Sequence, residues 1–221
     1  MDIVIVGNSD FAKMMGKYIR EDERYNLLAY TVSGKYIAED DNDGIPVIAI
    51  ENLKEFYNPN NVKLLLAIGY SQVAQIKKSL FEQLVEMGYS FMNYIHPRAI
   101  VDSSLISGSG NIILEGVIIG KDIFIGNGNL FFQGAVISHN NKIGDYNTFA
   151  SNAVMAGYSQ ICNNNFIGLG ACIRNNITIG SYVFLGGATY IDIDLPDESV
   201  ALPPKSQITK GRGSKFIWDK I

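Results

Sequence analysis

Side chains that can exchange protons near neutral pH are scarce in this chain. It holds two histidines, His96 and His139, and two cysteines, Cys162 and Cys172. That count excludes a zinc site with three histidine ligands, and cysteines spaced like these favour neither a disulfide nor a metal site. The sequence therefore predicts no metal, and His139 is either a plain surface histidine or a group that exchanges a proton. His96 precedes Pro97, and we interpret that pair as structural.

A second candidate site is the loop of Gly7, Asn8 and Ser9. It follows a buried apolar run and precedes a helical segment, where a dinucleotide fingerprint would stand. Only the first glycine of G-x-G-x-x-G is present, so NAD binding is weakly supported, although backbone amides at a helix N-terminus suit any phosphate. Gly69 and Tyr70 end another predicted strand at the same edge, where ligands tend to bind. Tyr70 either packs on a base or sugar or is a plain surface aromatic.

These candidates stand in two different frameworks. From Ile113 to Ile191 every sixth residue is large and apolar. A helix needs apolar spacing near 3.6 and a flat strand needs 2, whereas a strict six fits a solenoid in which each unit forms one side of a three-sided coil. Residues eighteen apart then stack, and the prism has no pocket of its own. The apolar positions are Ile113, Ile119, Ile125, Phe131, Ile137, Ile143, Phe149, Met155, Ile161, Ile167, Ile173, Ile179, Leu185 and Ile191.

Two further regularities accompany the six-residue period. Glycine often follows the aliphatic position directly, as at Gly120, Gly126 and Gly144, and we interpret that slot as a corner whose backbone conformation suits glycine. The residue two before each aliphatic position is mostly small or Asn, so each side turns one large and one small residue inward. We expect the asparagines of this set to form hydrogen-bonded ladders along the stack. They are Asn111, Asn129, Asn141, Asn147 and Asn165.

The N-terminal part follows a different pattern. Apolar runs alternate with helical segments, which predicts a parallel sheet with right-handed crossovers. The acidic stretch 39–43 is expected to be a solvated loop. The predicted strands cover 3–7, 27–32, 45–50, 62–69 and 91–95, and the predicted helices cover 11–19, 51–56 and 73–87.

Composition excludes several classes of protein. Hydrophobic residues make up 47% of the chain and the net charge is −4, which argues against general nucleic-acid binding. There is no run of eighteen apolar residues, and no basic signal segment follows Met1, so we expect a cytoplasmic protein. Residues 205–221 are rich in Lys and Arg and form either a solvated tail or an anion site.

Motifs in both parts carry a family resemblance. The six-residue unit has the hexapeptide-repeat signature, which is an aliphatic residue, a glycine, two variable residues, a small residue and one more. On this signature the chain resembles the left-handed β-helix acyltransferases. It is similar to the branch with a small N-terminal α/β domain, which comprises sialic-acid-type sugar O-acetyltransferases and N-acetyltransferases of nucleotide-linked amino sugars. The motifs lie at 4–7, 11–12, 65–69, 94–99, 137–139, 142–146 and 186–189. The resemblance implies a Rossmann-like domain over 1–97, a left-handed parallel β-helix over 98–204 and a short basic extension over 205–221.

The resemblance also implies catalytic roles. His139 would accept a proton from a sugar amine that attacks the acetyl-CoA thioester, a task that suits an unperturbed histidine pKa of about 6.5. The family usually has an acid after this histidine, and here Asn140 follows, which supplies no charge. Gly157, one coil along, would stabilise the oxyanion through its N–H and admit the pantetheine arm, or it is simply a corner glycine. The place of a second family histidine is occupied by Thr148.

The function expected is therefore acetyl-CoA-dependent N-acetylation of a nucleotide-linked amino-deoxy sugar for a bacterial surface glycan. Gly7, Asn8, Ser9, Gly69 and Tyr70 would hold the nucleotide sugar in a homotrimer, without nucleic acid or a membrane span. The family usually carries an Asp pair after the second strand, but residues 30–33 read Tyr-Thr-Val-Ser, which leaves the base open. Coenzyme A would contact Gly157, Pro204 and Lys205. Sugar O-acetylation, transfer of a longer acyl group and a non-catalytic sugar-nucleotide-binding module remain as alternatives.

Overall fold

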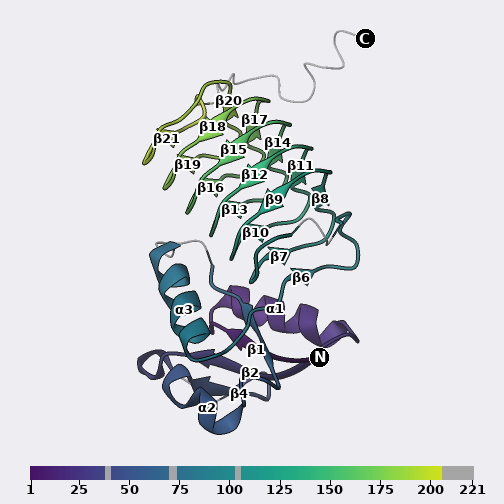
Figure 1. The fold of residues 1–221 in the computed structure, drawn as a ribbon, viewed down its shortest axis with the longest axis vertical. Coiled ribbons are helices and arrows are strands. Elements are labelled where there is room, and N and C mark those ends of the chain that lie inside the picture. Colours follow the sequence, from purple (N-terminus) through teal and green to yellow (C-terminus); the bar gives the residue numbers. More distant parts are fainter. Residues whose placement is uncertain (38–40, 70–73, 103–105, 206–221) are drawn as a thin grey trace, which may run out of the picture.

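The computed structural model describes residues 1–37, 41–69, 74–102 and 106–205, and it stacks a triangular β-helix on a small α/β domain (Figure 1). None of the helices in these ranges is long and apolar enough to span a membrane. The elements of the first domain are β1 (Asp2–Val6), α1 (Asp10–Glu21), β2 (Asn26–Val32), η1 (Gly34–Tyr36), β3 (Asp41–Asn42), β4 (Ile45–Ala49), η2 (Ile50–Asn52), α2 (Leu53–Phe56), β5 (Lys63–Leu66) and α3 (Ala74–Glu86).

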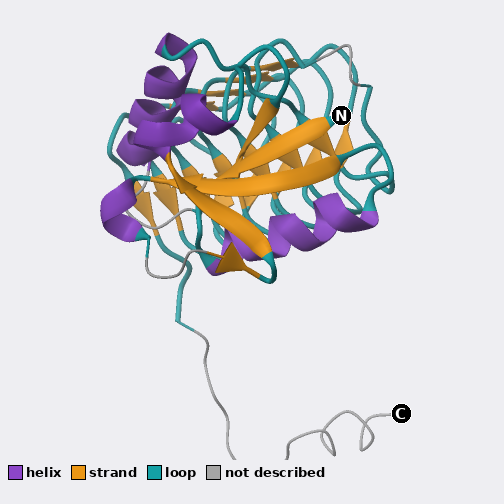
Figure 2. Cartoon of the chain, turned by 90° about the horizontal axis from the view of Figure 1, so that it is seen from below, coloured by secondary structure: helices purple, strands orange, loops and turns teal. Residues whose placement is uncertain are grey.

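The sheet of the α/β domain has the order β3-β4-β2-β1-β5. β1, β2, β4 and β5 are parallel, as predicted, and β3 pairs antiparallel with β4. Side chains alternate along β1, so Ile3 and Ile5 pack on α1 while Val4 and Val6 pack with α2 and α3. Figure 2 shows helices on both faces of this sheet. The domain is therefore a Rossmann-like layer structure.

Two expectations for this domain were wrong. Part of the acidic stretch is not a loop, because Asp41–Asn42 forms β3. The run 91–95 is not a strand of the α/β sheet: Phe91 makes one isolated bridge to Leu64, and β6 (Tyr94–Ile95) pairs with the first strand of the β-helix. An apolar run predicts a strand but does not say which sheet the strand joins.

The β-helix has three faces, each a parallel sheet. Because partners are eighteen residues apart in the chain, as in Leu130 with Thr148, the six-residue period is confirmed. The first face holds β6, β7 (Ile112–Ile113), β10 (Leu130–Phe131), β13 (Thr148–Phe149), β16 (Phe166–Ile167), β19 (Phe184–Leu185) and β21 (Val200–Ala201). The second face holds β8 (Ile118–Ile119), β11 (Val136–Ile137), β14 (Val154–Met155), β17 (Cys172–Ile173) and β20 (Tyr190–Ile191), and the third holds β9 (Phe124–Ile125), β12 (Lys142–Ile143), β15 (Gln160–Ile161) and β18 (Thr178–Ile179).

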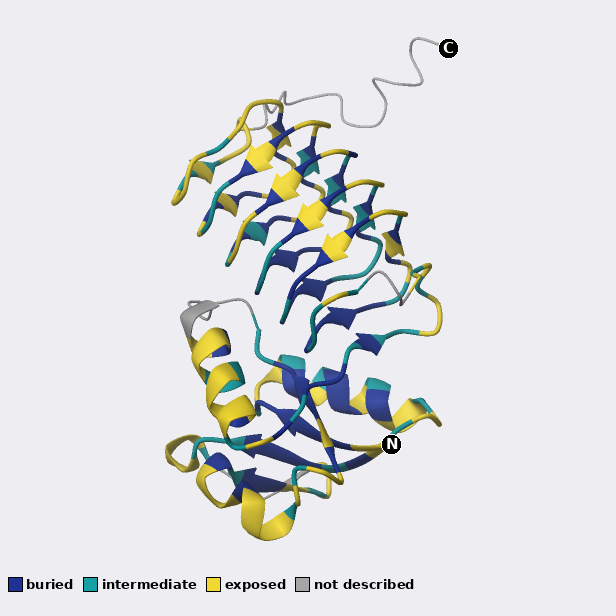
Figure 3. Ribbon diagram, viewed as in Figure 1, coloured by how far each residue is buried: buried dark blue, intermediate teal, exposed yellow. Residues whose placement is uncertain are grey.

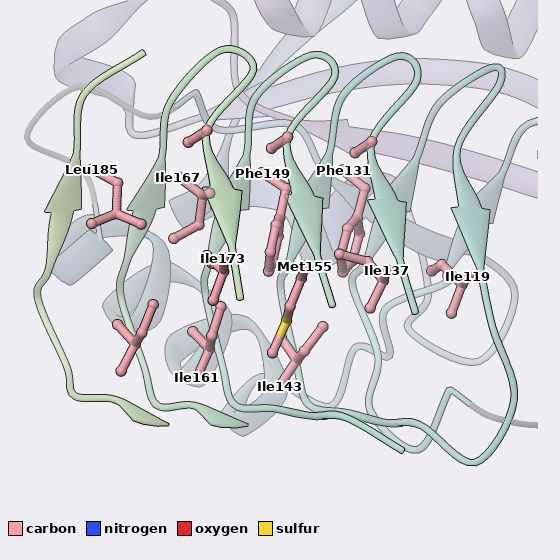
Figure 4. Close-up of a cluster of buried hydrophobic side chains, with 14 of the residues drawn as sticks. Ile119, Phe131, Ile137, Ile143, Phe149, Met155, Ile161, Ile167, Ile173 and Leu185 are labelled. Atoms are coloured by element: carbon pink, nitrogen blue, oxygen red, sulfur yellow. The ribbon is translucent and has the colours of Figure 1, made fainter. Parts of the chain in front are cut away.

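All fourteen periodic apolar residues are buried in one continuous core (Figure 4). Each third-face strand has one buried apolar residue and one residue on the outside of the prism. Figure 3 shows that the outer residue of each of these strands is exposed. The predicted asparagine ladder is also present: Asn129 and Asn147 each donate their backbone N–H to the side-chain oxygen of the asparagine one coil before, both at 2.8 Å. In the same way Asn165 donates its N–H to the side-chain oxygen of Asn147, and Asn111 donates its N–H to that of Asn93. Asn141 of the predicted set is not in this ladder, because its side-chain oxygen accepts from the Ser159 N–H at 2.8 Å in another column. The ladder bonds most of its buried amides, and Asn165 Nδ2 has no partner among the described residues.

The interpretation of the glycine slot was wrong. Gly120, Gly126 and Gly144 have ordinary φ angles, and the left-handed residues lie two positions further on, three after the aliphatic residue. Glycine is needed in the earlier slot because the coils approach closely there: a Cβ on Gly144 would lie 2.7 Å from the Cys162 carbonyl oxygen. The left-handed column contains Gly110, Gly116, Asp122, Gly128, Gly134, Asn140, Tyr146, Asn152, Tyr158, Asn164, Gly170, Asn176, Tyr182 and Ala188.

The two domains share a packed interface. Outward-facing Ile112 and Leu130 of the first face belong to the core cluster of the α/β domain, and Tyr18 of α1 donates its hydroxyl proton to Glu115 at 2.8 Å. Burial, then the bond to Glu115, raises the pKa of Tyr18. On the other side, Lys77 of α3 donates to the Gly128 carbonyl at 3.4 Å. The α/β domain thus covers the lower part of the first face.

Candidate active site

His139 occupies the corner between the second and third faces, two residues after buried Ile137. Its side chain is exposed, as the register predicted. Its Nδ1 atom lies 2.7 Å from Asn140 Oδ1, and its ring meets the Tyr158 ring edge-on at a centroid distance of 5.2 Å. The corner therefore presents an imidazole that two neighbouring side chains hold in place.

Gly157 lies directly against this imidazole, one coil along. A Cβ on Gly157 would stand 2.9 Å from His139 Cε1 and 3.2 Å from Nδ1. Its φ is not in the left-handed range, so the corner-conformation alternative is wrong and the glycine is needed for space. Among the described residues, none accepts a hydrogen bond from the Gly157 N–H, which leaves that donor available to a ligand.

The loop after β1 is tightly held. Gly7 has a φ of 124° and donates its N–H to the Thr31 carbonyl at 2.8 Å. A Cβ on Gly7 would come 2.6 Å from the Ala67 carbonyl oxygen, so only glycine lets β1 and β5 end side by side here. Ser9 caps α1 by accepting from the Ala12 N–H at 3.5 Å. Asn8, half-buried, lies between them at the helix N-terminus.

Gly69 stands at the same edge of the sheet, just beyond β5, with open space around its Cα. Tyr70 lies outside the described residues. A cavity of about 510 Å³ elsewhere, at the domain junction, includes His96, whose ring packs edge-on against Tyr18 at 5.5 Å, in agreement with a structural role. Beside the Gly69 edge is another cavity, of about 500 Å³, lined by Val32, Ser33, Lys35, Tyr36, Ile68, Ile76, Ser79, Leu80 and Gln83.

Pro204 and Lys205 are exposed at the end of the described chain, shortly after β21. The rest of the basic tail lies outside the described residues. No group of three His, Cys, Asp or Glu side chains able to hold a metal ion occurs within the described ranges.

The structure does not bring the two candidate sites together within one chain. The α/β domain packs on the first face, whereas His139 stands at the corner between the second and third faces. In a triangular coil that corner is the vertex opposite the first face. The loop of Gly7, Asn8 and Ser9 therefore lies across the prism from the imidazole.

Sequence reasoning missed two neighbours of His139. It treated Asn140 only as an absent acid, although its amide oxygen is in contact with the ring. It did not consider Tyr158, although the spacing of eighteen from Asn140 places it in the neighbouring coil. The eighteen-residue spacing was therefore the signal in the sequence that could have identified Tyr158. Of the nine residues that line the cavity beside Gly69, the sequence pointed only to Val32, Ser33 and Ile68, and it did not indicate a cavity there.

Comparisons with known proteins agree with this architecture. Residues 2–84 match the family model described as the PglD N-terminal domain. The acetyltransferase domain of PglB from Neisseria gonorrhoeae is similar with a TM-score of 0.82 and 22% identity, over 91% of this chain and 96% of that chain. PerB from Caulobacter crescentus, in complex with CoA and GDP-perosamine, gives a TM-score of 0.81 and 25% identity, over 95% and 98%.

WeeI from Acinetobacter baumannii gives a TM-score of 0.77 and 20% identity, over 92% of this chain and 97% of that chain. No curated protein matches the sequence. Residues 2–84 therefore match a PglD N-terminal domain, and over nearly its whole length the chain shares the fold of these solved structures, an α/β domain joined to a left-handed parallel β-helix.

Proposed function

We propose that the protein is an acetyl-CoA-dependent N-acetyltransferase that acts on a nucleotide-linked amino-deoxy sugar. One observation carries the proposal: an exposed imidazole is seated against a glycine of the next coil, at a corner of the prism. That arrangement combines a base with a close approach for an extended thioester. The complexes of PglB with acetyl coenzyme A and of PerB with CoA and GDP-perosamine support the choice of substrates.

In this reaction the sugar amine attacks the thioester carbonyl carbon, and a carbon–nitrogen bond forms. His139 accepts the proton that the nitrogen loses. The tetrahedral intermediate then collapses, the carbon–sulfur bond breaks, and the imidazolium returns its proton to the departing CoA thiolate. The products are an amide and free CoA.

Gly157 serves the same step through its backbone. Its unengaged N–H would donate to the oxyanion as the carbonyl becomes tetrahedral. The missing side chain leaves room for both the imidazole and the pantetheine arm. This role is compatible with the close contact that excludes a Cβ at the position.

A homotrimer would complete the site. Within one chain the Gly7 loop and His139 lie on opposite sides of the prism, so a neighbouring chain must supply one of them. The outward side chains of the second face form an apolar column that suits such an interface under cyclic symmetry. They are Ile118, Val136, Val154, Cys172 and Tyr190, of which Ile118 is 40% and Tyr190 63% exposed.

The nucleotide would bind at the carboxyl edge of the α/β sheet. Gly7, whose own N–H is held by the Thr31 carbonyl, would shape the turn in which Asn8 and Ser9 meet its phosphates. Gly69 and Tyr70 are the further proposed contacts. The cavity lined in part by Ser33, Tyr36 and Gln83 has the size of a nucleoside. CoA would run along the prism towards Pro204 and Lys205. Both substrates are made inside the cell, so we place the enzyme in the cytoplasm, in bacterial surface-glycan synthesis.

The direct test is a panel of UDP-, GDP- and dTDP-linked amino sugars incubated with the protein and acetyl-CoA. We expect one of them to gain a single acetyl group, detected by mass spectrometry, with equimolar release of CoA thiol. The new acetyl group should survive hydroxylamine, because an amide resists it and an ester does not. An ester product would favour sugar O-acetylation instead, and tight binding without thiol release would favour a non-catalytic binding module.

A further inference from the structure

His139 Nδ1 and Asn140 Oδ1 are 2.7 Å apart, and this contact has a chemical direction. With the amide oxygen facing the ring, this contact is a hydrogen bond only in the tautomer whose Nδ1 carries the hydrogen, which leaves the lone pair on Nε2. We infer that Asn140 is the positioning residue that fixes His139 as the Nδ1–H tautomer and presents Nε2 as the base. This inference rests on the proposed function and names the residue that stands in place of the family's acid.

The backbone places Asn140 for this role. Its φ is 57°, in the left-handed region that asparagine tolerates better than most residues. Its N–H donates to the Lys121 carbonyl of the preceding coil at 3.0 Å. The corner geometry thus fixes the main chain on both sides, and the short amide side chain turns back onto the neighbouring imidazole.

The remaining surroundings of the ring are neutral where they touch it. The ring leans towards the following coil, where Gly157 lies beneath it and Tyr158 meets it at an interplanar angle of 85°. The charged residues of the preceding coil at this corner are Lys121 and Asp122, and no described contact joins either side chain to the ring. Asn140 therefore orients the base without adding charge.

This arrangement differs chemically from a histidine–carboxylate pair. A carboxylate stabilises the imidazolium as well as the tautomer, whereas the amide stabilises the tautomer alone. The amide supplies no charge to the imidazolium, so the driving force for removing a proton is smaller than with a carboxylate. Such a base suits an amine, which loses its proton readily once attack has begun, better than a sugar hydroxyl.

Nitrogen NMR of histidine-labelled protein tests the tautomer without any activity assay. The chain has only two histidines, and His96 provides an internal reference, because its Nδ1 accepts the Arg98 N–H at 3.1 Å. With both rings neutral, we expect His139 as the Nδ1–H form and His96 as the Nε2–H form. Finding His139 in the Nε2–H form, as for His96, would overturn the inference.

Steady-state kinetics test whether the contact between Asn140 and His139 contributes to turnover. Asn140→Gly keeps the left-handed backbone available and removes the amide, and we expect kcat to fall about 10- to 100-fold with KM nearly unchanged. Asn140→Asp should retain most of the wild-type kcat, because a carboxylate also accepts from Nδ1–H. It should move the acidic limb of the kcat/KM profile to higher pH. Asn152→Gly, at another left-handed corner, and Asp122→Asn should behave like the wild type. A wild-type kcat in Asn140→Gly, or an Asn140→Asp variant as slow as Asn140→Gly, would contradict the role.

His139→Ala separates this inference from the function on which it rests. Full turnover in His139→Ala would remove the proposed base altogether. Loss of turnover in His139→Ala combined with normal turnover in Asn140→Gly would reject Asn140 alone.

Discussion

The imidazole of His139 rests on the Cα of Gly157, and a Cβ there would stand 2.9 Å from Cε1. Because that Cβ would also stand 3.0 Å from the His139 carbonyl oxygen, a methyl group at Gly157 must push the imidazole away from its place. This contact joins the candidate base to the candidate oxyanion donor in a single structural unit.

We expect Gly157→Ala to lower kcat about 10- to 100-fold, since a displacement of the ring by about 1 Å is costly in a positioned site. Steady-state kinetics with the acetylated sugar as product measures the effect. Gly187→Ala is the matched control, because Gly187 has the same place in the repeat and its added Cβ would be 3.2 Å from the Leu169 carbonyl oxygen. Equal effects of the two changes would mean that the contact with His139 is irrelevant.

The six-residue period predicted the prism because each inward position is fixed by spacing alone. The corners could not be read in this way, because the left-handed column accepts Gly, Asn, Asp, Tyr and Ala, so no residue type marks it. Glycine instead marks the slot where coils approach most closely.

The candidate site was predictable only in part. His139 followed from its register and from the family resemblance, and its exposure is as expected. The sequence shows that Asn140 follows His139, but not which atom of its side chain faces the ring. It also does not reveal that the nucleotide loop lies across the prism, because that depends on which face the α/β domain covers.

The asparagine ladder predicts a large loss of stability for Asn147→Ala. The amide of buried Asn147 accepts from the Asn165 N–H at 3.0 Å and donates to the Cys162 carbonyl at 2.9 Å. Removing it strands both partners, so the free energy of unfolding should fall by about 2–4 kcal/mol. Urea unfolding at fixed protein concentration measures the change.

Asn163→Ala serves as the control for the ladder. Asn163 is exposed and accepts from the Asp145 N–H at 2.7 Å, where water can replace the lost bond, so its removal should cost less than about 1 kcal/mol. A loss as large as that of Asn147→Ala would show that burial of the ladder does not matter.

For Lys77 we predict a substitution that raises the free energy of unfolding, whereas the ladder substitution lowers it. The lysine side chain is 3% exposed, and burial lowers the pKa of Lys77 from 10.5 to about 8. The folded chain therefore holds this proton less tightly than the unfolded chain does. The destabilisation is complete below pH 8 and is relieved as pH rises from 8 to 10.5.

Lys77→Met should accordingly raise the free energy of unfolding at pH 7, by about 3 kcal/mol at most. It should also flatten the increase in stability that the wild type shows between pH 8 and pH 10.5. Exposed Lys78 gives the control, and Lys78→Met should leave both quantities unchanged. If Lys77→Met destabilises the protein at pH 7, the ammonium is compensated and this account of its burial is wrong.

The apolar column of the second face predicts which substitution breaks the proposed trimer. Val154→Arg places a charge in the proposed interface, and light scattering should report smaller species at a concentration where the wild type is trimeric. Thr178→Arg, on the exposed third face, should stay trimeric. A wild type that is monomeric at every concentration would contradict the shared site.

The most direct test of the account is the turnover of His139→Ala with acetyl-CoA and the amino sugar selected by the panel. We predict that kcat falls about 10²- to 10⁴-fold while the Kd for CoA stays nearly the same, because the imidazole moves a proton and does not hold the donor. A variant that acetylates the sugar at close to the wild-type rate would contradict the claim that His139 is the base.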